Sequence, residues 1–378
     1  SYQAWSYASL IDSYNQEVYD RNIGLHPCAF LHNYELKEND PINSEQYRDY
    51  INAAPMFGAK DFEKLRDFIK RFVTEGDDKE GLYIIENGKI KPSKMLQDSF
   101  SSVLKGNKEF VLIDDQKVIF EEALRIGINA HLHNEKSVLI VEGGPGTGKS
   151  VLAINLLKQF LNRSLNSFYV TKNSAPREVF KAKLKIDKMS GLNNLFKGSG
   201  SFYDCEPNSF DVLIVDEAHR LNKKSGLFSN LGENQIKEII NSSKFSIFFI
   251  DENQRVTLKD NGSIDEIKKY ARYYNAGIHK MELKSQFRCD GSDGYLAWLD
   301  NVLDIRETAN FDLDSKYDFK VFDDPNELRK AIEEKNKINN KSRLVAGYCW
   351  NWISEGKNKS DVYDITIPEH DFGMSWNL

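Results

Sequence analysis

The fold of this chain is decided by the stretch Val138-Leu139-Ile140-Val141-Glu142-Gly143-Gly144-Pro145-Gly146-Thr147-Gly148-Lys149-Ser150. It begins with a short β-branched apolar run, which is typical of a buried parallel strand. A glycine-rich turn follows, and the apolar residues after Ser150 then continue as a helix. Residues 143–150 match the pattern G-x-x-x-x-G-K-S, so the sequence predicts a phosphate-binding loop between a strand and a helix.

The residue types in this loop suit a polyphosphate ligand. Glycines let backbone N–H groups curl around phosphates, and the N-terminus of the following helix adds partial positive charge. We expect Lys149 to reach the β- and γ-phosphates and the Ser150 hydroxyl to hold Mg²⁺. The predicted nucleotide-binding residues are Gly143, Gly144, Pro145, Gly146, Thr147, Gly148, Lys149 and Ser150.

The composition is that of an ordinary globular protein with two or three domains. The 378 residues are 40% hydrophobic and 29% charged, and the net charge of −6 gives no global basic signal for nucleic acid. A local basic groove is still compatible with that total. The four cysteines form no C-x-x-C pair, which argues against a disulfide framework or a zinc site and fits a reducing cytoplasm. No apolar run reaches membrane-spanning length, and no signal peptide opens the sequence.

The chain is predicted to contain an α+β amino-terminal domain at 1–106, an α/β domain at 107–284 and a further unit at 285–378. The middle region alternates strands and helices, as a parallel sheet covered by helices does. Its strands are expected at 137–142, 167–171, 211–216, 245–251 and 279–283, and its helices at 115–133, 149–161, 176–182 and 233–241. The stretch 188–208 is rich in Gly, Ser and Asn and is expected to loop out.

The flanking regions give weaker patterns. Residues 62–72 have the apolar spacing of an amphipathic helix, and residues 86–89 resemble a hairpin turn. The other elements expected from the patterns are strands at 28–34, 318–322 and 343–348 and a helix at 325–335.

Two carboxylates, Asp216 and Glu217, follow the apolar strand predicted at 211–216. We expect Asp216 to hold Mg²⁺ through water or through Ser150, and Glu217 to orient and polarise the attacking water. A solvated strand end is the alternative, but the pair follows a phosphate-binding loop at a suitable distance. The sequence therefore predicts a site for nucleoside-triphosphate hydrolysis.

The strand predicted at 245–251 leads into Asp251-Glu252-Asn253-Gln254. Because parallel strands deliver their carboxyl ends to the same edge of a sheet, these polar groups are expected at the nucleotide. We expect Gln254 to sense the γ-phosphate with support from Asp251. A polar loop without a catalytic role is the alternative.

Two further side chains are candidates for contacts with the nucleotide. Gln116 stands at the start of the first helix of the middle region, where its amide offers both a donor and an acceptor to an adenine edge. Arg288 offers a guanidinium that is expected to reach the γ-phosphate across a cleft between two units. The alternatives are a solvated helix start and a surface ion pair.

These motifs together resemble those of superfamily 1 helicases, and most closely the bacterial Schlafen-like helicase domain. The resemblance covers residues 111–350 and rests on Gln116, residues 143–150, Asp216-Glu217-Ala218-His219, Asp251-Glu252-Asn253-Gln254 and Gln286-Phe287-Arg288. It implies an α/β fold with one complete and one partial RecA-like P-loop NTPase domain. In that family, two such domains clamp ATP between them and step along a nucleic acid strand.

The same resemblance implies strand contacts just after the second strand of the middle region, at Thr171, Asn173 and Pro176. His219 is assigned to the strand with them, and the alternative for the Thr/Asn loop is a simple turn. Family members carry further motifs in the second RecA-like domain, including a second arginine at the ATP, that are not found before Leu378. Because the sequence also begins with Ser1 rather than Met, we expect it to be a piece of a longer protein.

The amino-terminal region carries a fainter resemblance. Gln3 and Tyr7 form a Q-x-x-x-Y pattern on a predicted helix, similar to the last motif of RecB-like PD-(D/E)-x-K nucleases. In that family the Gln and Tyr face the substrate strand, and an Asp and a Glu-x-Lys upstream bind the metals. Glu35-Leu36-Lys37 follows the pattern instead of preceding it, so we assign it no catalytic role. A plain amphipathic helix is the alternative.

The sequence thus favours an ATP- and Mg²⁺-dependent translocase or helicase acting on single-stranded or partly duplex nucleic acid, and DNA is more expected than RNA as that nucleic acid. The resemblances imply the motor part of a nuclease–helicase fusion, with anti-phage defence as a natural setting. Two alternatives stay open: a P-loop NTPase switch that controls a protein partner, and a scaffold that binds nucleotide without turnover.

Overall fold

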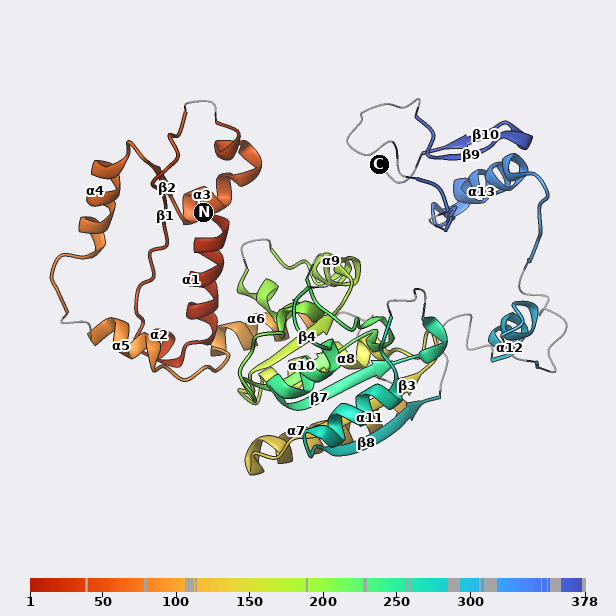
Figure 1. The fold of residues 1–378 in the computed structure, drawn as a ribbon, viewed down its shortest axis with the longest axis horizontal. Helices are drawn as coiled ribbons and strands as arrows, with labels where there is room; N and C mark the ends of the chain where they lie inside the picture. Colours follow the sequence, from red (N-terminus) through yellow and green to blue (C-terminus); the bar gives the residue numbers. More distant parts are fainter. Residues whose placement is uncertain are drawn as a thin grey trace. The chain divides into compact units, whose positions relative to one another are not determined.

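The structure, a computed structural model, divides the chain into two compact units, Ser1–Ser292 and Asp293–Leu378. Figure 1 shows them as ribbons, coloured from red at the amino terminus to blue at the carboxyl terminus. The residues that the structure describes are 1–37, 40–77, 80–105, 112, 114–187, 190–226, 230–255, 257, 260–284, 293–305, 307–308, 318–347, 349–351, 353 and 362–375.

A six-stranded parallel sheet forms the centre of the first unit (Figure 1). Its strands are β3 (Ser137–Gly143), β4 (Ser167–Thr171), β5 (Phe196–Gly198), β6 (Phe210–Val215), β7 (Ser243–Ile250) and β8 (Gly277–Leu283). They lie in the order β5-β4-β6-β7-β3-β8, and every neighbouring pair is parallel. All carboxyl ends therefore share one edge of the sheet. The connections after the neighbouring strands β3 and β7 leave in opposite directions, and open α/β sheets bind ligands at such a point.

Helices cover both faces of this sheet. They are α7 (Asp114–His133), α8 (Lys149–Leu161), α9 (Ser174–Lys183), α10 (Gln235–Ser242) and α11 (Ile264–Tyr273). The connection from β3 through α8 to β4 runs along the sheet towards β5, whereas the connections through α10 and α11 run towards β8. Because such crossovers are right-handed, α8 lies on one face of the sheet and α10 and α11 lie on the other. In agreement, α7 packs on α8 and α10 packs on α11, with α10 and α11 in front of the sheet in Figure 1.

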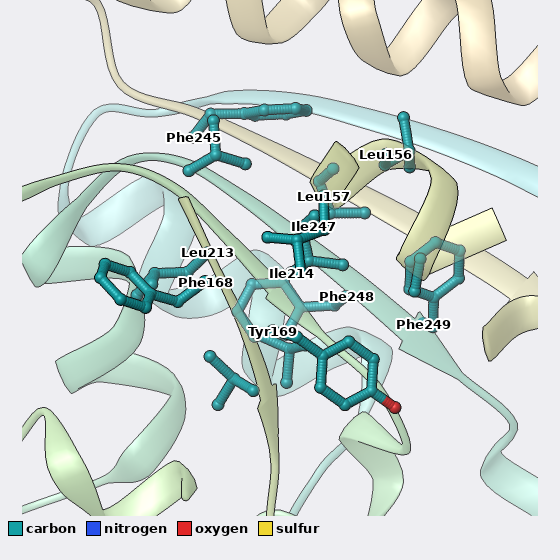
Figure 2. Close-up of a cluster of buried hydrophobic side chains, with 14 of the residues drawn as sticks. Leu156, Leu157, Phe168, Tyr169, Leu213, Ile214, Phe245, Ile247, Phe248 and Phe249 are labelled. Atoms are coloured by element: carbon teal, nitrogen blue, oxygen red, sulfur yellow. The ribbon is translucent and has the colours of Figure 1, made fainter. Parts of the chain in front are cut away.

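The core of the first unit lies between the sheet and its helices. Leu139, Ile140 and Val141 of β3 are fully buried, as expected for a parallel strand covered on both faces. Figure 2 shows Leu156 and Leu157 of α8 beside the buried side chains of β6 and β7. This α/β, RecA-like fold confirms the predicted fold class, and the predicted strands and helices of the middle region agree with the observed ones within about two residues at each end.

One prediction for this region is wrong. The stretch 188–208, expected to loop out, contains the edge strand β5, which pairs with β4. Phe196 is buried there and lies against Tyr169, with ring centroids 5.6 Å apart. Leu192, Leu195 and Phe202 of the same segment are buried as well, but these scattered apolar residues form no periodic pattern in the sequence.

The amino-terminal segment is mainly helical. Its elements are α1 (Tyr2–Tyr14), α2 (Gln16–Asp20), β1 (Ala29–Leu31), α3 (Arg48–Ala53), β2 (Met56–Gly58), α4 (Phe62–Phe72), α5 (Glu80–Glu86) and α6 (Lys94–Leu104). The helix expected at 62–72 is confirmed, and the strand expected at 28–34 is the shorter β1, which pairs in parallel with β2.

The hairpin turn expected at 86–89 is wrong. Glu86 ends α5, so a helix and not a strand precedes the turn. The chain after the turn pairs with the end of α1 instead, because Gln16 donates to the Lys89 carbonyl at 2.9 Å and Lys91 donates to the Tyr14 carbonyl at 2.7 Å. A polar Asn-Gly pair marks a turn but does not specify which elements flank it.

The amino-terminal helices share a core with the sheet. Leu96, Phe100 and Leu104 of α6 belong to the same buried cluster as the strands. Tyr14 of α1 stacks on Phe168 of β4, with ring centroids 5.3 Å apart. A domain boundary at residue 106 stays a prediction, since residues 106–111 lie outside the described part of the chain.

The second unit contains α12 (Asp293–Val302), α13 (Pro325–Asn339) and an antiparallel pair of β9 (Ile365–Ile367) and β10 (Phe372–Met374). The helix expected at 325–335 is confirmed as part of α13. The strands expected at 318–322 and 343–348 are wrong for the residues described there, which lie outside any helix or strand. Val321 and Val345 are 80% and 88% exposed, and among the described residues these segments have no partner strand. None of the described helices is long and apolar enough to cross a membrane.

Candidate nucleotide-binding and catalytic site

The loop between β3 and α8 has the backbone geometry of a phosphate cradle. Gly146 and Gly148 have φ angles of +82° and +80°, in the left-handed region that side chains other than glycine rarely adopt. Gly148 precedes the first turn of α8 as its N-cap. A Cβ atom on Gly148 would lie 2.0 Å from Nε2 of Gln116, so a larger residue there would also displace the Gln116 amide.

Lys149 lies across this loop. Its Nζ donates to the Gly143 carbonyl at 2.5 Å and to the Gly144 carbonyl at 2.7 Å. The Thr147 hydroxyl donates to the same Gly144 carbonyl at 3.0 Å. A helix N-terminus and an ammonium group thus converge on one loop, which is the arrangement that binds phosphate groups. Pro145, the remaining predicted loop residue, lies in the turn between Gly144 and Gly146.

Ser150 and Asp216 meet at the carboxyl edge of the sheet, although they are far apart in sequence. The Ser150 hydroxyl donates to Oδ2 of Asp216 at 2.5 Å. The same Oδ2 accepts from the Tyr169 hydroxyl at 2.6 Å, and Oδ1 accepts from the backbone N–H of Glu217 at 2.9 Å. Asp216 is only 2% exposed, so these three donors compensate the burial of its charge.

Ser150 and Asp216 are the candidate magnesium ligands. Both offer hard oxygen atoms, and Mg²⁺ is usually held by one or two protein oxygens together with nucleotide phosphates and waters. In the described part of the chain, no group of three or more His, Cys, Asp and Glu side chains is arranged to hold a metal. The donor set therefore fits a nucleotide-bound Mg²⁺ better than a metal held by protein alone.

Glu217 has a strained backbone next to this pair. Its φ and ψ angles are 52° and 44°, the left-handed region that costs a non-glycine residue free energy and often marks functional sites. Burial raises the pKa of the Glu217 carboxyl above its usual value, and the charge of Asp216 raises it further. Asn173 donates to Oε2 of Glu217 over 3.5 Å, a long contact that joins the loop after β4 to the catalytic candidate.

Gln116, at the start of α7, is buried against the phosphate loop. It is 3% exposed, and its Nε2 donates to the Thr147 carbonyl at 3.0 Å. The structure thus brings this predicted site residue to the nucleotide loop. Its predicted contact with adenine stays a prediction.

The residues after β7 form their own small network. Asp251 accepts from Nε2 of Gln254 at 2.9 Å and from the backbone N–H of Asn253 at 3.1 Å. His219 is 3% exposed, and its Nδ1 accepts from the backbone N–H of Asp251 over 3.4 Å. Burial lowers the pKa of His219, which favours the neutral ring that this acceptor role requires.

The residues predicted to contact a nucleic acid strand differ in exposure. Thr171 is fully buried and its hydroxyl has no hydrogen-bond partner among the described residues. Asn173 is half-buried at the N-cap of α9, which also contains Pro176. Gln3 donates to the Tyr7 hydroxyl at 2.8 Å on the exposed face of α1.

Some predicted residues and motifs are not placed at the site. Arg288, with Gln286 and Phe287, lies outside the described residues. Glu35 pairs with Lys60, with its Oε1 2.5 Å from Nζ, on the surface of the amino-terminal segment.

Asp260 is a residue of this region that sequence reasoning missed. Its side chain is fully buried and lies 2.9 Å from Nζ of Lys172 and 3.2 Å from Nε of Arg220. The carboxylate also accepts from the backbone N–H of Thr257 at 3.0 Å. Asp260 thus joins the segments after β4, β6 and β7, and a single acid in a polar loop gives no sequence signal for this role.

Comparisons with known proteins agree with this geometry. The family model described as "Schlafen group 3, DNA/RNA helicase domain" matches residues 136–378. An uncharacterized protein of Saccharomyces cerevisiae is 26% identical over 258 residues, which cover 59% of this chain and 56% of that protein. The chain thus spans about half the length of this curated relative.

Solved structures give only distant likenesses. Pif1 helicase from Candida albicans is 14% identical, with a TM-score of 0.33 over 63% of this chain and 56% of that chain. Domain III of the replication initiation protein DnaA from Thermotoga maritima is 18% identical, with a TM-score of 0.26 over 63% of this chain and 90% of that chain. Since the family model matches more than half of the sequence, including the phosphate loop and the acid pair, the chain belongs to the Schlafen group 3 DNA/RNA helicase domain family.

Proposed function

We propose that this chain hydrolyses ATP with Mg²⁺ and uses the reaction to translocate along, or unwind, single-stranded or partly duplex nucleic acid, for which we propose DNA ahead of RNA. The observation that carries the proposal is the convergence of Lys149, the Ser150–Asp216 pair and Glu217 at one edge of the sheet. Family membership supports nucleic acid as the partner.

The site residues divide the chemistry of hydrolysis among them. Lys149 and the loop N–H groups hold the β- and γ-phosphates, and Ser150 with Asp216 holds Mg²⁺, which when bound neutralises charge on those phosphates. Glu217 orients the attacking water and accepts its proton as the bond between the γ-phosphorus and the bridging oxygen breaks. The pKa of Glu217, raised by burial and by Asp216, makes its carboxylate a stronger base than a solvated one.

Three more residues complete the proposed ATP site. Gln116 contacts the adenine edge from the base of the phosphate loop. Gln254, held by Asp251, senses the γ-phosphate. Arg288 supplies positive charge to the transition state.

The nucleic acid side of the proposal rests on the loop after β4. Asn173 contacts Glu217, and Lys172 is joined through Asp260 to Arg220 beside the acid pair. A strand that binds near Asn173 would therefore meet a segment in direct contact with the catalytic carboxylate. Thr171 and His219 are buried, so we propose that they support the fold of this region and do not contact the strand.

We also propose that the chain is the motor part of a nuclease–helicase fusion, with defence against foreign DNA as its setting. The hydrogen bond between Gln3 and Tyr7 on the exposed face of α1 supports a surface that contacts a strand. Neither side chain is an anionic metal ligand, and the described residues include no metal-binding cluster, so we expect this chain by itself to bind without cutting.

ATP hydrolysis measured with and without single-stranded DNA or RNA tests the proposal. We expect strong stimulation by a single strand and affinity for the strand that falls steeply with salt. Hydrolysis that no strand stimulates would favour the NTPase switch that controls a protein partner. Nucleotide binding without hydrolysis would favour the scaffold.

A further inference from the structure

Tyr169 has an unusual place in the core. It lies in the middle of β4, in register with Ile214 of the neighbouring strand β6, which leads into Asp216. Its side chain is fully buried, yet its hydroxyl reaches Oδ2 of Asp216 at 2.6 Å. Figure 2 shows this hydroxyl oxygen, in red, at the margin of an otherwise apolar cluster.

Two aromatic rings pack against the ring of Tyr169. Phe180 of α9 lies edge-on to it with ring centroids 5.5 Å apart, and Phe196 of β5 lies at 5.6 Å. Phenylalanine would fill the same volume and spare the desolvation of a hydroxyl. The distinctive contribution of the tyrosine is therefore its bond to Asp216.

The Tyr169 hydroxyl donates to the same oxygen of Asp216 that accepts from Ser150. Oδ2 of Asp216 accepts from both Tyr169 and Ser150, while Oδ1 accepts from the backbone of Glu217. Ser150 is itself a candidate metal ligand, so of the two donors on Oδ2 the tyrosine is the one with no role at the metal. Groups that orient metal ligands in this way commonly change metal affinity when removed.

We propose that Tyr169 is a positioning residue that fixes the Asp216 carboxylate for magnesium-nucleotide binding. The inference rests on the proposed function, because it assigns Asp216 to Mg²⁺. Tyr169 contacts neither nucleotide nor metal in this account. It holds the rotamer of Asp216 and, through Oδ1, supports the strained backbone of Glu217.

The test is Tyr169→Phe, which removes one oxygen atom. We expect the Mg²⁺ concentration for half-maximal ATP hydrolysis to rise about tenfold or more. A second readout needs no turnover: the factor by which Mg²⁺ strengthens binding of a fluorescent ATP analogue should shrink, while binding in EDTA stays unchanged. A purely structural hydroxyl would lower the thermal midpoint in EDTA without changing that factor.

The chain offers a matched control. Tyr14 is also buried, at 5% exposure, and its hydroxyl has no hydrogen-bond partner among the described residues. Tyr14→Phe removes the same atom from a buried ring that is not among the hydrogen-bond partners of Asp216, so its magnesium dependence should match that of the unaltered chain.

The outcomes separate this inference from the proposed function. A Tyr169→Phe variant with unaltered magnesium dependence, or one that fails to fold in EDTA while Tyr14→Phe folds, would overturn the positioning role alone. If Mg²⁺ does not strengthen nucleotide binding even in the unaltered chain, the proposed magnesium site falls and this inference falls with it.

Discussion

The nucleotide side and the strand side of one sheet edge differ in how their predicted residues lie. On the nucleotide side (residues 143–150, Asp216 and Glu217), Lys149 contacts the loop carbonyls, Ser150 contacts Asp216 and Asp216 contacts Glu217. On the strand side (Thr171, Asn173 and His219), two of the three side chains are buried and the third contacts Glu217. The nucleotide side thus brings its motifs into direct contact, whereas two of the three residues on the strand side lie in the protein interior.

The largest effect is expected on the nucleotide side, for Lys149→Ala. Loss of the ammonium that meets the phosphates should lower the rate of ATP hydrolysis by about 10³-fold and also weaken nucleotide binding. Steady-state hydrolysis and binding of a fluorescent ATP analogue measure both effects. Lys158→Ala, in the last turn of the same helix, is the control and should leave both unchanged. Near-normal hydrolysis by Lys149→Ala would remove the phosphate loop from the account.

Glu217→Gln should separate chemistry from binding. The amide keeps the size of the side chain but loses the base, so we expect hydrolysis to fall by about 10²-fold or more while nucleotide affinity stays normal. Glu266→Gln changes a carboxylate that pairs with Lys269 on the surface of α11 and serves as the control. Equal losses of affinity in Glu217→Gln and Lys149→Ala would contradict the roles assigned to them.

Asp260→Asn should reveal the link between the two sides. It removes the charge that Lys172 and Arg220 share in a buried position, which we expect to cost about 2–3 kcal/mol of unfolding free energy. The cost should stay below that of a fully enclosed pair, because water reaches part of both cationic side chains. Chemical denaturation measures it, with exposed Asp265→Asn as control. A change within experimental error would mean that solvent already screens both cations.

The smallest effect is expected for Thr171→Val on the strand side. The Thr171 hydroxyl is buried with no hydrogen-bond partner among the described residues, so an isosteric methyl should change stability by less than about 1 kcal/mol. Affinity for single-stranded DNA should also be unchanged if Thr171 acts only from within. A clear loss of DNA affinity in a normally stable variant would restore the direct contact that the sequence predicted.

Much of the nucleotide side could be predicted because its signals are local. The β-branched run at 138–141 and the glycines after it specify strand, loop and helix within a dozen residues. The bond from Tyr169 to Asp216 joins residues 47 positions apart, and no local sequence pattern predicts it. The role of Asp260 is not predicted for the same reason, because its partners Lys172 and Arg220 lie far from it in the sequence.

The wrong element predictions also have a physical cause. The segments 318–322 and 343–348 contain apolar residues that favour strands, but a strand needs a partner, and the exposed Val321 and Val345 have none among the described residues. β5 is the reverse case, because the edge of β4 provides a partner for a segment with almost no pattern. Strand pairing depends on the rest of the fold, so the sequence of one segment does not show whether a partner strand is present.

Movement on single-stranded DNA is the most direct test of the central claim that this site drives translocation. The measurement is ATP-dependent displacement of streptavidin from end-biotinylated single-stranded DNA, with Glu217→Gln as the variant that binds but does not hydrolyse. We expect displacement by the unaltered chain with Mg²⁺ and ATP, and none with Glu217→Gln or a non-hydrolysable analogue. Strand-stimulated hydrolysis without any displacement from either DNA end would contradict it and favour the switch.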